Sequence, residues 1–235
     1  MLWQSFVEDL LRGVSGPLGV RLRRAYYRRR LQSCGARLVI EPGVHLLRPE
    51  CISLGDDVWI DRHAILIAGP PGQDAQISRR QSVEVSPNPG EIRIGDRAHI
   101  GAGSIVQGHG GVWIGDAFTA SPHAKIYSLS NDQRKCRSGT HPAAGAGVYY
   151  VMTPVVIGDN VWLGINCVII GHMIGSDTFV KPGAVVSRSI PPNSVVEGAP
   201  AKRTCARFHD ADRAPSGRPR GAARTSAGAK LAAGS

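Results

Sequence analysis

The chain has 235 residues, 42% of them hydrophobic, and a formal net charge of +10; this length allows one main domain with a sizeable core and short appendages. All of the excess positive charge lies in two segments: residues 21–30, with six arginines and no acid, and residues 211–235, with five basic residues and one acid. The rest of the chain is neutral on balance, which argues against a nucleic-acid-binding groove through the folded body.

Residues 1–33 are expected to form a helical cap. Apolar side chains recur with helical spacing in residues 2–11, residues 13–17 break the pattern, and residues 18–31 have the composition of a second, basic helix. This segment either packs on the open end of the domain that follows, with its arginines outward, or contacts the anionic face of a membrane. The two roles are compatible.

The next segment, residues 34–203, contains a repeat of six residues. From residue 54 onward an aliphatic side chain recurs at every sixth position, in five groups of three, and glycine directly follows seven of these key residues. The key residues are Leu54, Ile60, Leu66, Ile94, Ile100, Val106, Ile114, Ala120, Ile126, Ile157, Leu163, Ile169, Ile174, Val180 and Val186.

A period of six fits neither an amphipathic helix nor an antiparallel meander. It fits a solenoid in which three short strands and three tight corners complete one triangular coil. The key residues would point inward and stack from coil to coil, and the glycines would supply corner conformations that are closed to residues with a Cβ. The spacing alone does not establish the hand of the coil.

Two long interruptions divide the repeat: residues 68–91, and residues 129–153, which contain Asn131, Asp132 and His141. Segments of this length between regular elements are typically functional or disordered, and we expect each to project from a corner. The C-terminal extension, residues 204–235, ends in a run of small and basic residues and is expected to be largely disordered.

The sequence of residues 154–203, PVVIGDNVWLGINCVIIGHMIGSDTFVKPGAVVSRSIPPNSVVEGAPAKR, resembles the C-terminal signature of the maltose, galactoside and nodulation-factor O-acetyltransferases and of their relatives in capsule and exopolysaccharide clusters. With the regular hexads of residues 51–67 and 91–203, the resemblance extends over roughly half to two-thirds of the chain. It implies a left-handed parallel β-helix, acetyl-CoA as the acyl donor, no metal, and a homotrimer with active sites in the clefts between subunits.

The resemblance also assigns residues to the donor. In the family, main chain next to small residues hydrogen-bonds the pantetheine arm, and cations near the C-terminus meet the nucleotide phosphates, for which Arg and Lys are well suited. The positions that match are Gly164, Pro182, Ala184, Ser187, Arg188 and Lys202. The alternative for Arg188 and Lys202 is that they are solvated surface bases. Trp162 matches an aromatic wall of the family's acceptor site, with ordinary packing as its alternative.

The catalytic base departs from the family pattern. Relatives carry a histidine in strings such as YTANHD or YSLSNH, because a base with a pKa near neutral pH is needed to accept the proton of the acceptor hydroxyl. Here the string is YSLSNDQ, residues 127–133, so Asn131 is followed by Asp132. Either Asp132 serves as base with a pKa raised by desolvation, or His109 or His141 replaces the histidine, or the protein is an impaired enzyme that acts as a scaffold.

Another class with the same fold is the γ-type carbonic anhydrase, which binds a metal through three histidines. His63 and His99 have about the right separation, but Ser104 occupies the third position, and catalytic zinc needs three protein ligands. The five cysteines are widely spaced and form no CxxC pair, which indicates neither a disulfide framework nor a zinc site.

No apolar stretch is long enough to span a bilayer, and no secretion signal is evident. The sequence therefore predicts a cytoplasmic O-acyltransferase that acts on a sugar hydroxyl of a surface polysaccharide or glycolipid, with contact to the inner face of the membrane as a further expectation.

Overall fold

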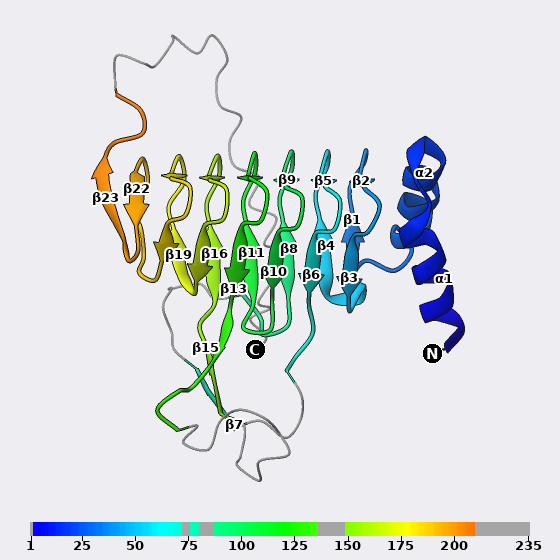
Figure 1. The fold of residues 1–235 in the computed structure, drawn as a ribbon, viewed down its shortest axis with the longest axis horizontal. Coiled ribbons are helices and arrows are strands. Elements are labelled where there is room, and N and C mark those ends of the chain that lie inside the picture. Colours follow the sequence, from blue (N-terminus) through cyan, green and yellow to red (C-terminus); the bar gives the residue numbers. More distant parts are fainter. Residues whose placement is uncertain (1, 72–75, 80–86, 136–148, 210–235) are drawn as a thin grey trace, which may run out of the picture.

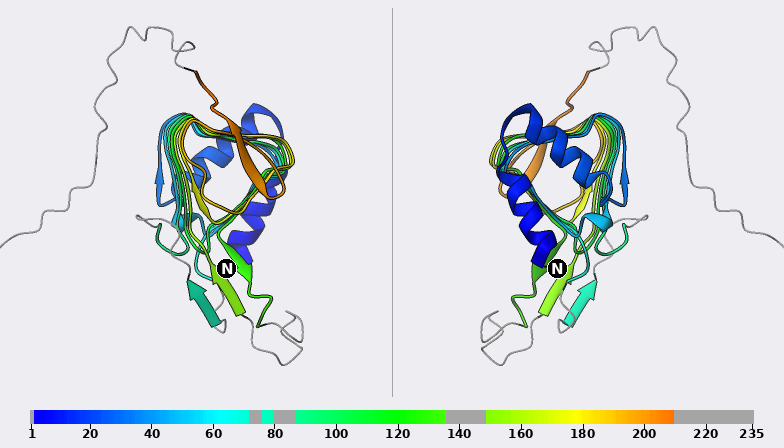
Figure 2. Two further views of the ribbon diagram at one scale, coloured as in Figure 1. Left: turned by 90° about the vertical axis from the view of Figure 1, so that its left-hand side faces the viewer. Right: turned by 90° about the vertical axis from the view of Figure 1, so that its right-hand side faces the viewer.

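The computed structural model describes residues 2–71, 76–79, 87–135 and 149–209. Most of them form a stack of triangular coils that runs along one axis (Figures 1 and 2). Each complete coil contributes one parallel strand to each of three sheets, and the last described strand pairs antiparallel with its neighbour. We call the corner between the first and second sheets the first corner, that between the second and third sheets the second corner, and that where the third sheet leads into the next coil the third corner.

The first sheet contains β1 (Ser33–Cys34), β4 (Ile52–Leu54), β8 (Ile92–Ile94), β11 (Val112–Ile114), β16 (Val155–Ile157) and β19 (His172–Ile174). The second sheet contains β2 (Val39–Ile40), β5 (Trp59–Ile60), β9 (His99–Ile100), β12 (Thr119–Ala120), β17 (Trp162–Leu163), β20 (Phe179–Val180), β22 (Val195–Gly198) and β23 (Ala201–Cys205). The third sheet contains β3 (His45–Leu47), β6 (Ile65–Ile67), β10 (Ile105–Gln107), β13 (Lys125–Tyr127), β18 (Val168–Ile170) and β21 (Val185–Val186).

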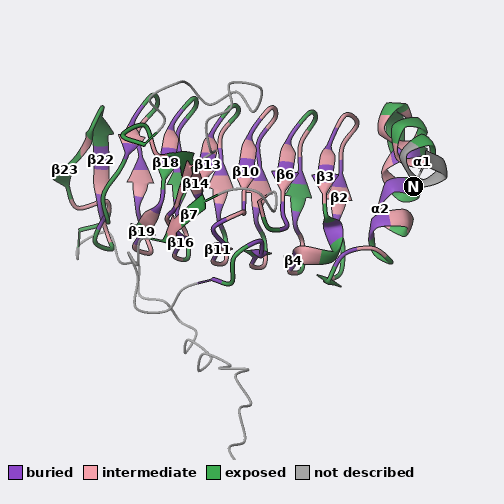
Figure 3. Ribbon diagram, turned by 90° about the horizontal axis from the view of Figure 1, so that it is seen from below, coloured by how far each residue is buried: buried purple, intermediate pink, exposed green. Residues whose placement is uncertain are grey.

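The interior of the coils confirms the meaning of the repeat. All fifteen key residues are buried, and equivalent residues lie opposite one another in register, as Leu54 does with Ile94 and Ile94 with Ile114. Figure 3 shows that buried residues recur in the strands of successive coils. Each fully buried aliphatic side chain of this size contributes roughly 1.5–3 kcal/mol by leaving water, so the columns stabilise the stack.

One coil precedes those that the repeat predicts. Its inward residues are Cys34, Ile40 and Leu46, and Cys34 lies in register with Leu54. The sequence pattern misses this coil for two reasons: cysteine occupies an aliphatic position, and the short helix η1 (Pro49–Cys51) lengthens the spacing before Leu54.

The first corner shows why Gly-Asp recurs. The Asp96 carboxylate accepts a hydrogen bond from the backbone N–H of Asp56 at 2.7 Å, and Asp116 accepts one from Asp96 at 2.8 Å. A Cβ added to Gly95 would lie 2.3 Å from Oδ1 of Asp116. The expected reason for these glycines is therefore wrong: they are needed for close approach between coils, and the positive φ falls two residues later, at non-glycine residues such as Arg97 (φ 56°).

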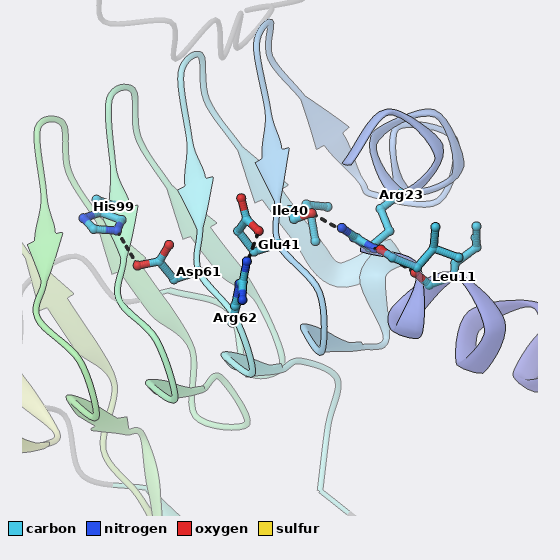
Figure 4. Close-up of polar contacts among 8 residues, drawn as sticks. Leu11, Arg23, Ile40, Glu41, Asp61, Arg62 and His99 are labelled. Carbon is cyan, nitrogen blue, oxygen red and sulfur yellow. Dashed lines mark hydrogen bonds and ion pairs between the residues drawn. The ribbon is translucent and has the colours of Figure 1, made fainter. Parts of the chain in front are cut away.

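Two helices, α1 (Leu2–Gly13) and α2 (Gly16–Tyr27), lie across the N-terminal end of the stack (Figure 1). Arg23 of α2 is 1% exposed. Its Nε donates to the carbonyl of Ile40 at 2.8 Å, and its Nη1 donates to the carbonyls of Leu11 at 2.8 Å and Val14 at 2.6 Å (Figure 4). Arg23 therefore joins both helices to the first coil. No helix among the described residues is long and apolar enough to cross a bilayer.

The two interruptions meet in an arm that projects from the stack (Figures 1 and 2). Strands β14 (Leu129–Asn131) and β15 (Tyr149–Met152) come from the second interruption and pair antiparallel, and β7 (Gln76–Arg79) from the first interruption pairs parallel with β15. The segments thus have short strands that the sequence did not indicate. Of the C-terminal extension expected to be largely disordered, residues 204–209 are described, with residues 204 and 205 completing β23, and residues 210–235 lie outside the described residues.

Candidate functional site

The third corner carries the irregular parts of the chain. The coils place there, in order along the stack, both ends of each interruption, the segment that holds His109, the Gly171-His172 turn, and Ser187 with Arg188. The other two corners lack such insertions in the described coils. Residues that the sequence separates by up to 120 positions, from residue 68 to residue 188, are therefore aligned along one edge of the prism.

A cavity of about 520 Å³ opens on this edge at the root of the arm. It is lined by Ser130, Asn131, Asp132, Gln133, Arg134, Val151, Thr153, Ile170, His172 and Ser187. Three of these, Asn131, Asp132 and Ser187, were predicted as site residues from the sequence. The structure brings them together with a histidine, His172, that the sequence analysis did not single out.

The root of the arm is fixed by a buried serine. Ser128 is 1% exposed, and its hydroxyl donates to the carbonyl of Gln107 at 2.6 Å and accepts from the N–H of Gly110 at 2.9 Å. The Gln107 side chain in turn accepts from the N–H of Leu129 at 3.1 Å, and the N–H of Thr153 donates to the carbonyl of Ser128 at 2.9 Å. Both ends of the arm are thus held on the coil, which positions the cavity wall.

Asp132 lies directly after β14, with 18% of its side chain exposed. Its N–H donates to the carbonyl of Tyr149 at 2.9 Å, and its Oδ1 accepts from the N–H of Arg134 at 3.2 Å. Lys135 Nζ lies 3.9 Å from Oδ2. The carboxylate is therefore held at the cavity by local bonds and one cation, with part of its surface open to solvent.

His172 is the first residue of β19 and is half-buried. It has a φ of +70°, and the preceding Gly171 has a φ of +65°, so two successive residues adopt the left-handed region. Such a conformation is uncommon for a residue with a side chain. One signal was available in the sequence: the key residues Ile169 and Ile174 are five positions apart instead of six, and the histidine lies in this shortened interval.

His109 lies on the same corner in the turn between β10 and β11, two coils before His172, and is not among the residues that line the cavity. Its Nδ1 lies 2.7 Å from the carbonyl oxygen of Gly69. Since a carbonyl only accepts, Nδ1 must carry the hydrogen, and in the neutral ring this leaves Nε2 as the acceptor. The third predicted candidate, His141, lies outside the described residues.

The residues expected to contact the acyl donor divide between two corners. Ser187 and the exposed Arg188 lie on the third corner, whereas Gly164, Pro182 and Ala184 lie on the second. Pro182 is exposed, but a Cβ on Gly164 would meet the backbone N of Pro182 at 2.5 Å. Gly164 thus allows neighbouring coils to approach.

The Ala184 side chain is fully buried, so only the main chain of this residue could contact the acyl donor. Lys202 is exposed on β23, next to the C-terminal end of the stack. Trp162 stands on the outer face of the second sheet, 47% exposed. Its Nε1 donates to the hydroxyl of Ser121 at 3.0 Å, and its ring lies 5.4 Å from that of Phe179.

The pattern of the γ-type carbonic anhydrases has no counterpart in the geometry. Ser104 is 1% exposed and donates to the carbonyl of Ser121 inside the coil. His99 Nε2 lies 2.9 Å from Oδ2 of Asp61 (Figure 4). Within the described ranges, no three His, Cys, Asp or Glu side chains come together as a metal site.

Cys167, at the second corner, is not a reactive cysteine. Cys167 is buried behind the second corner, and burial raises the pKa of its thiol to about 12. A nucleophilic cysteine needs the opposite shift, towards the thiolate at neutral pH. Cys167 is therefore part of the core and not of a reactive site.

Known proteins resemble this chain in sequence and in fold. The family described as "Hexapeptide repeat of succinyl-transferase" matches residues 91–117 and 154–188. A probable acetyltransferase of Mycobacterium tuberculosis is 25% identical over 67% of this chain and 51% of its own length. The galactoside O-acetyltransferase of Escherichia coli is 42% identical over 21% of this chain and 25% of its own. The chain thus spans about half, or less, of the length of these curated relatives.

A solved structure shares the fold. The N-acyltransferase AntD of Bacillus cereus, crystallised with dTDP and coenzyme A, superposes with a TM-score of 0.62 at 21% identity, over 79% of this chain and 89% of its own. At this identity the likeness concerns the fold alone. With the matched hexapeptide repeats, it confirms the left-handed parallel β-helix, and the acetyltransferases named above are similar to parts of this chain.

Proposed function

We propose that the protein transfers an acyl group, most simply acetyl, from coenzyme A to a hydroxyl of a sugar. The observation that carries the proposal is the cavity at the third corner, in which His172, Asp132 and Asn131 face the same space as Ser187. A base, hydrogen-bonding groups and a position that matches the family's donor site thus adjoin one another. The sugar-modifying galactoside O-acetyltransferase among the relatives supports the acceptor class.

His172 is the proposed base. Imidazole ordinarily has a pKa closest to neutral pH, so it accepts a proton without the strong burial that a carboxylate would need. In the reaction the base removes the acceptor proton while the oxygen attacks the thioester carbonyl, and the tetrahedral intermediate collapses with release of the thiolate of coenzyme A. The proton then returns to that thiolate, which leaves an ester and free thiol.

Asp132 and Asn131 take the supporting roles. The Asp132 carboxylate adjoins the cavity and would orient the acceptor or stabilise a protonated imidazole, and Asn131, exposed at the end of β14, offers an amide to sugar hydroxyls. His109, whose Nδ1 hydrogen-bonds the carbonyl of Gly69, is the alternative base. It would act in a complex whose acceptor extends along the third corner. N–H groups of the cavity wall would stabilise the oxyanion.

The donor would lie between two copies of the chain. Pro182 and Gly164 are on the second corner and Ser187 is on the third, with the third sheet between them, so the two sets lie on different edges of one prism. A neighbouring copy can supply the missing edge, which favours the homotrimer of the family. Arg188 and Lys202, both exposed, are suited to the nucleotide phosphates.

The acceptor would be a sugar unit of a surface polysaccharide or glycolipid, modified in the cytoplasm. AntD has been crystallised with an amino-sugar nucleotide, dTDP-4-amino-4,6-dideoxyglucose, and coenzyme A. A sugar amine is therefore the second acceptor to test. It requires the same attack on the thioester, with nitrogen in place of oxygen.

The test is release of free thiol from acetyl-CoA by the full chain, with a panel of oligosaccharides, nucleotide sugars and amino-sugar nucleotides. We expect release that depends on an acceptor, and a product whose acetyl group is labile to hydroxylamine, as an ester is. An acetyl group stable to hydroxylamine would assign the amine instead. No thiol release with any acceptor, together with no binding of coenzyme A by calorimetry, would leave the scaffold as the function.

A further inference from the structure

Each of the helices α1 and α2 has a row of exposed apolar side chains. Leu18, Leu10 and Phe6, at 64, 61 and 60%, are the three most exposed large apolar side chains in the part of the chain that the structure describes, and Leu22 is 41% exposed. Phe6 and Leu10 are one turn apart on α1, and Leu18 and Leu22 are one turn apart on α2. Large apolar side chains exposed in such rows mark a contact surface.

Arginines share the face of α2 with these leucines. Its exposed positions recur at helical spacing: Leu18, Arg21, Leu22, Ala25, and then Arg28 and Arg29 just beyond its end. The opposite face has Gly19, Arg23 and Tyr27, four residues apart and all buried. The helix thus has one side that packs on the prism and another that presents apolar and basic groups together.

The acids near this face are already paired. Glu8 accepts from the hydroxyl of Tyr26 at 3.0 Å and lies 3.8 Å from Nε of Arg30, and Asp9 pairs with Arg12 at 2.7 Å. By contrast, no ion pair within the described ranges involves Arg21, Arg28 or Arg29. The charges of these three arginines are therefore not neutralised by acids of the described chain, and they can bind an anionic partner.

We propose that this face docks on the surface of an anionic lipid bilayer. The four apolar side chains would enter the boundary between headgroups and acyl chains, and Arg21, Arg28 and Arg29 would meet lipid phosphates, a combination that is typical of interfacial helices. Each helix has 12 residues, about 18 Å, which is shorter than the ~30 Å core of a bilayer. The helices therefore lie along the surface and hold the prism upright on it.

In the proposed trimer, prisms packed side by side would present three such faces at one end. Linked contacts of this kind raise the overall affinity well above that of one face. This gain rests on the proposed trimer, whereas the docking of each helical pair does not. The arrangement would hold the acyltransferase next to acceptors that are themselves attached to lipid.

The test is co-sedimentation of the full chain, without substrates, with phosphatidylcholine vesicles that either contain or lack phosphatidylglycerol. We expect binding to the anionic vesicles alone, and a loss of binding as salt is raised, since screening weakens exposed charges. The variant Leu18→Ser/Leu22→Ser and the variant Arg21→Gln/Arg28→Gln/Arg29→Gln should each lose roughly tenfold or more in affinity.

A matched control separates position from total charge. Arg48, Arg62 and Arg97 are exposed on the prism, at 63, 68 and 61% of their side chains, and changing all three to Gln removes the same charge and should leave binding unchanged. Equal loss in this control would overturn the proposal in favour of a general charge effect. Binding that survives the leucine variant would also overturn it, as would a leucine variant that changes the mass of the protein in solution, which would show that another copy covers the face. Thermal unfolding of each variant confirms that it is folded, and the salt series on the unmodified chain needs no variant.

Discussion

The first and third corners of the prism are built on opposite plans. At the first corner successive coils repeat one device: an aspartate accepts a hydrogen bond from the preceding coil, as Asp96 does from Asp56, and a glycine leaves room for it. At the third corner each coil differs, and the arm, Gly171-His172 and Ser187 follow one another along the edge. The repeated corner holds the stack together, and the irregular corner is therefore free to hold the proposed active site.

The largest effect should come from the third corner. His172→Asn removes the proposed base, and loss of a general base typically lowers kcat by ~10²–10⁴-fold. The melting temperature should stay the same, since His172 is only half-buried. His123, an exposed histidine of the second corner, is the control, and His123→Asn should keep full activity. Equal rates for His172→Asn and the unmodified protein would shift the role of base to His109 or Asp132.

Next in size is a change at the first corner. In Gly95→Ala the new Cβ would lie 2.3 Å from Oδ1 of Asp116 and 2.8 Å from backbone of the next coil. We expect a loss of about 1–3 kcal/mol in the free energy of unfolding, as for other overpacked sites, measured by urea denaturation. Gly13→Ala is the control, because nothing lies within 4 Å of its Cβ. If Gly95→Ala left the free energy of unfolding unchanged, the coils could move apart at this corner.

Cys167, in the wall between the second and third corners, gives a smaller and pH-dependent effect. Its pKa is raised by burial from 9.0 to about 12, so the folded state keeps the neutral thiol where the unfolded chain ionises. This contribution is complete below pH 9.0 and is lost as the pH rises through about 12. We expect unfolding experiments at pH 8 and 10 to show a steeper loss of stability for the unmodified protein than for Cys167→Val, by about 1 kcal/mol. Identical losses would mean that water reaches this wall.

The smallest effect should come from Asp96. Asp96→Ala removes the acceptor of one exposed hydrogen bond from the N–H of Asp56, a loss of about 0.5 kcal/mol in the free energy of unfolding. Asp96→Asn keeps an oxygen at the same place and should lose less. If the two variants have equal urea midpoints, the first corner depends on its glycines and not on its aspartates.

The regular part of the molecule could be predicted from the sequence because inward side chains such as Leu54 and Ile94 repeat the same environment in each coil. The first coil could not be recognised from the repeat, because Cys34 stands at an aliphatic position and extra residues precede Leu54. The reason for the glycines was also missed, because close approach between coils is a tertiary property that no local spacing reveals.

The site was predictable only in part. Asp132 and Ser187 were predicted through resemblance. Their proximity to His172 depends on the number of residues that each coil has at the third corner. The sequence did not indicate that β7 and β15 would pair, because the partners are 73 positions apart, with Gln76 opposite Tyr149. Which residues share the cavity therefore had to come from the structure.

The hydrogen bonds of Arg23 bear on whether the stack of coils can grow by adding another copy at its N-terminal end. The first strands of a stack of parallel coils offer unsatisfied backbone groups to any similar edge, which is the route by which open sheets grow into filaments. Arg23 occupies the carbonyl of Ile40 and ties α1 and α2 across that end. One buried side chain thus helps to keep the helices over the end of the stack. The covered end cannot pair with another copy, so the stack keeps a fixed length.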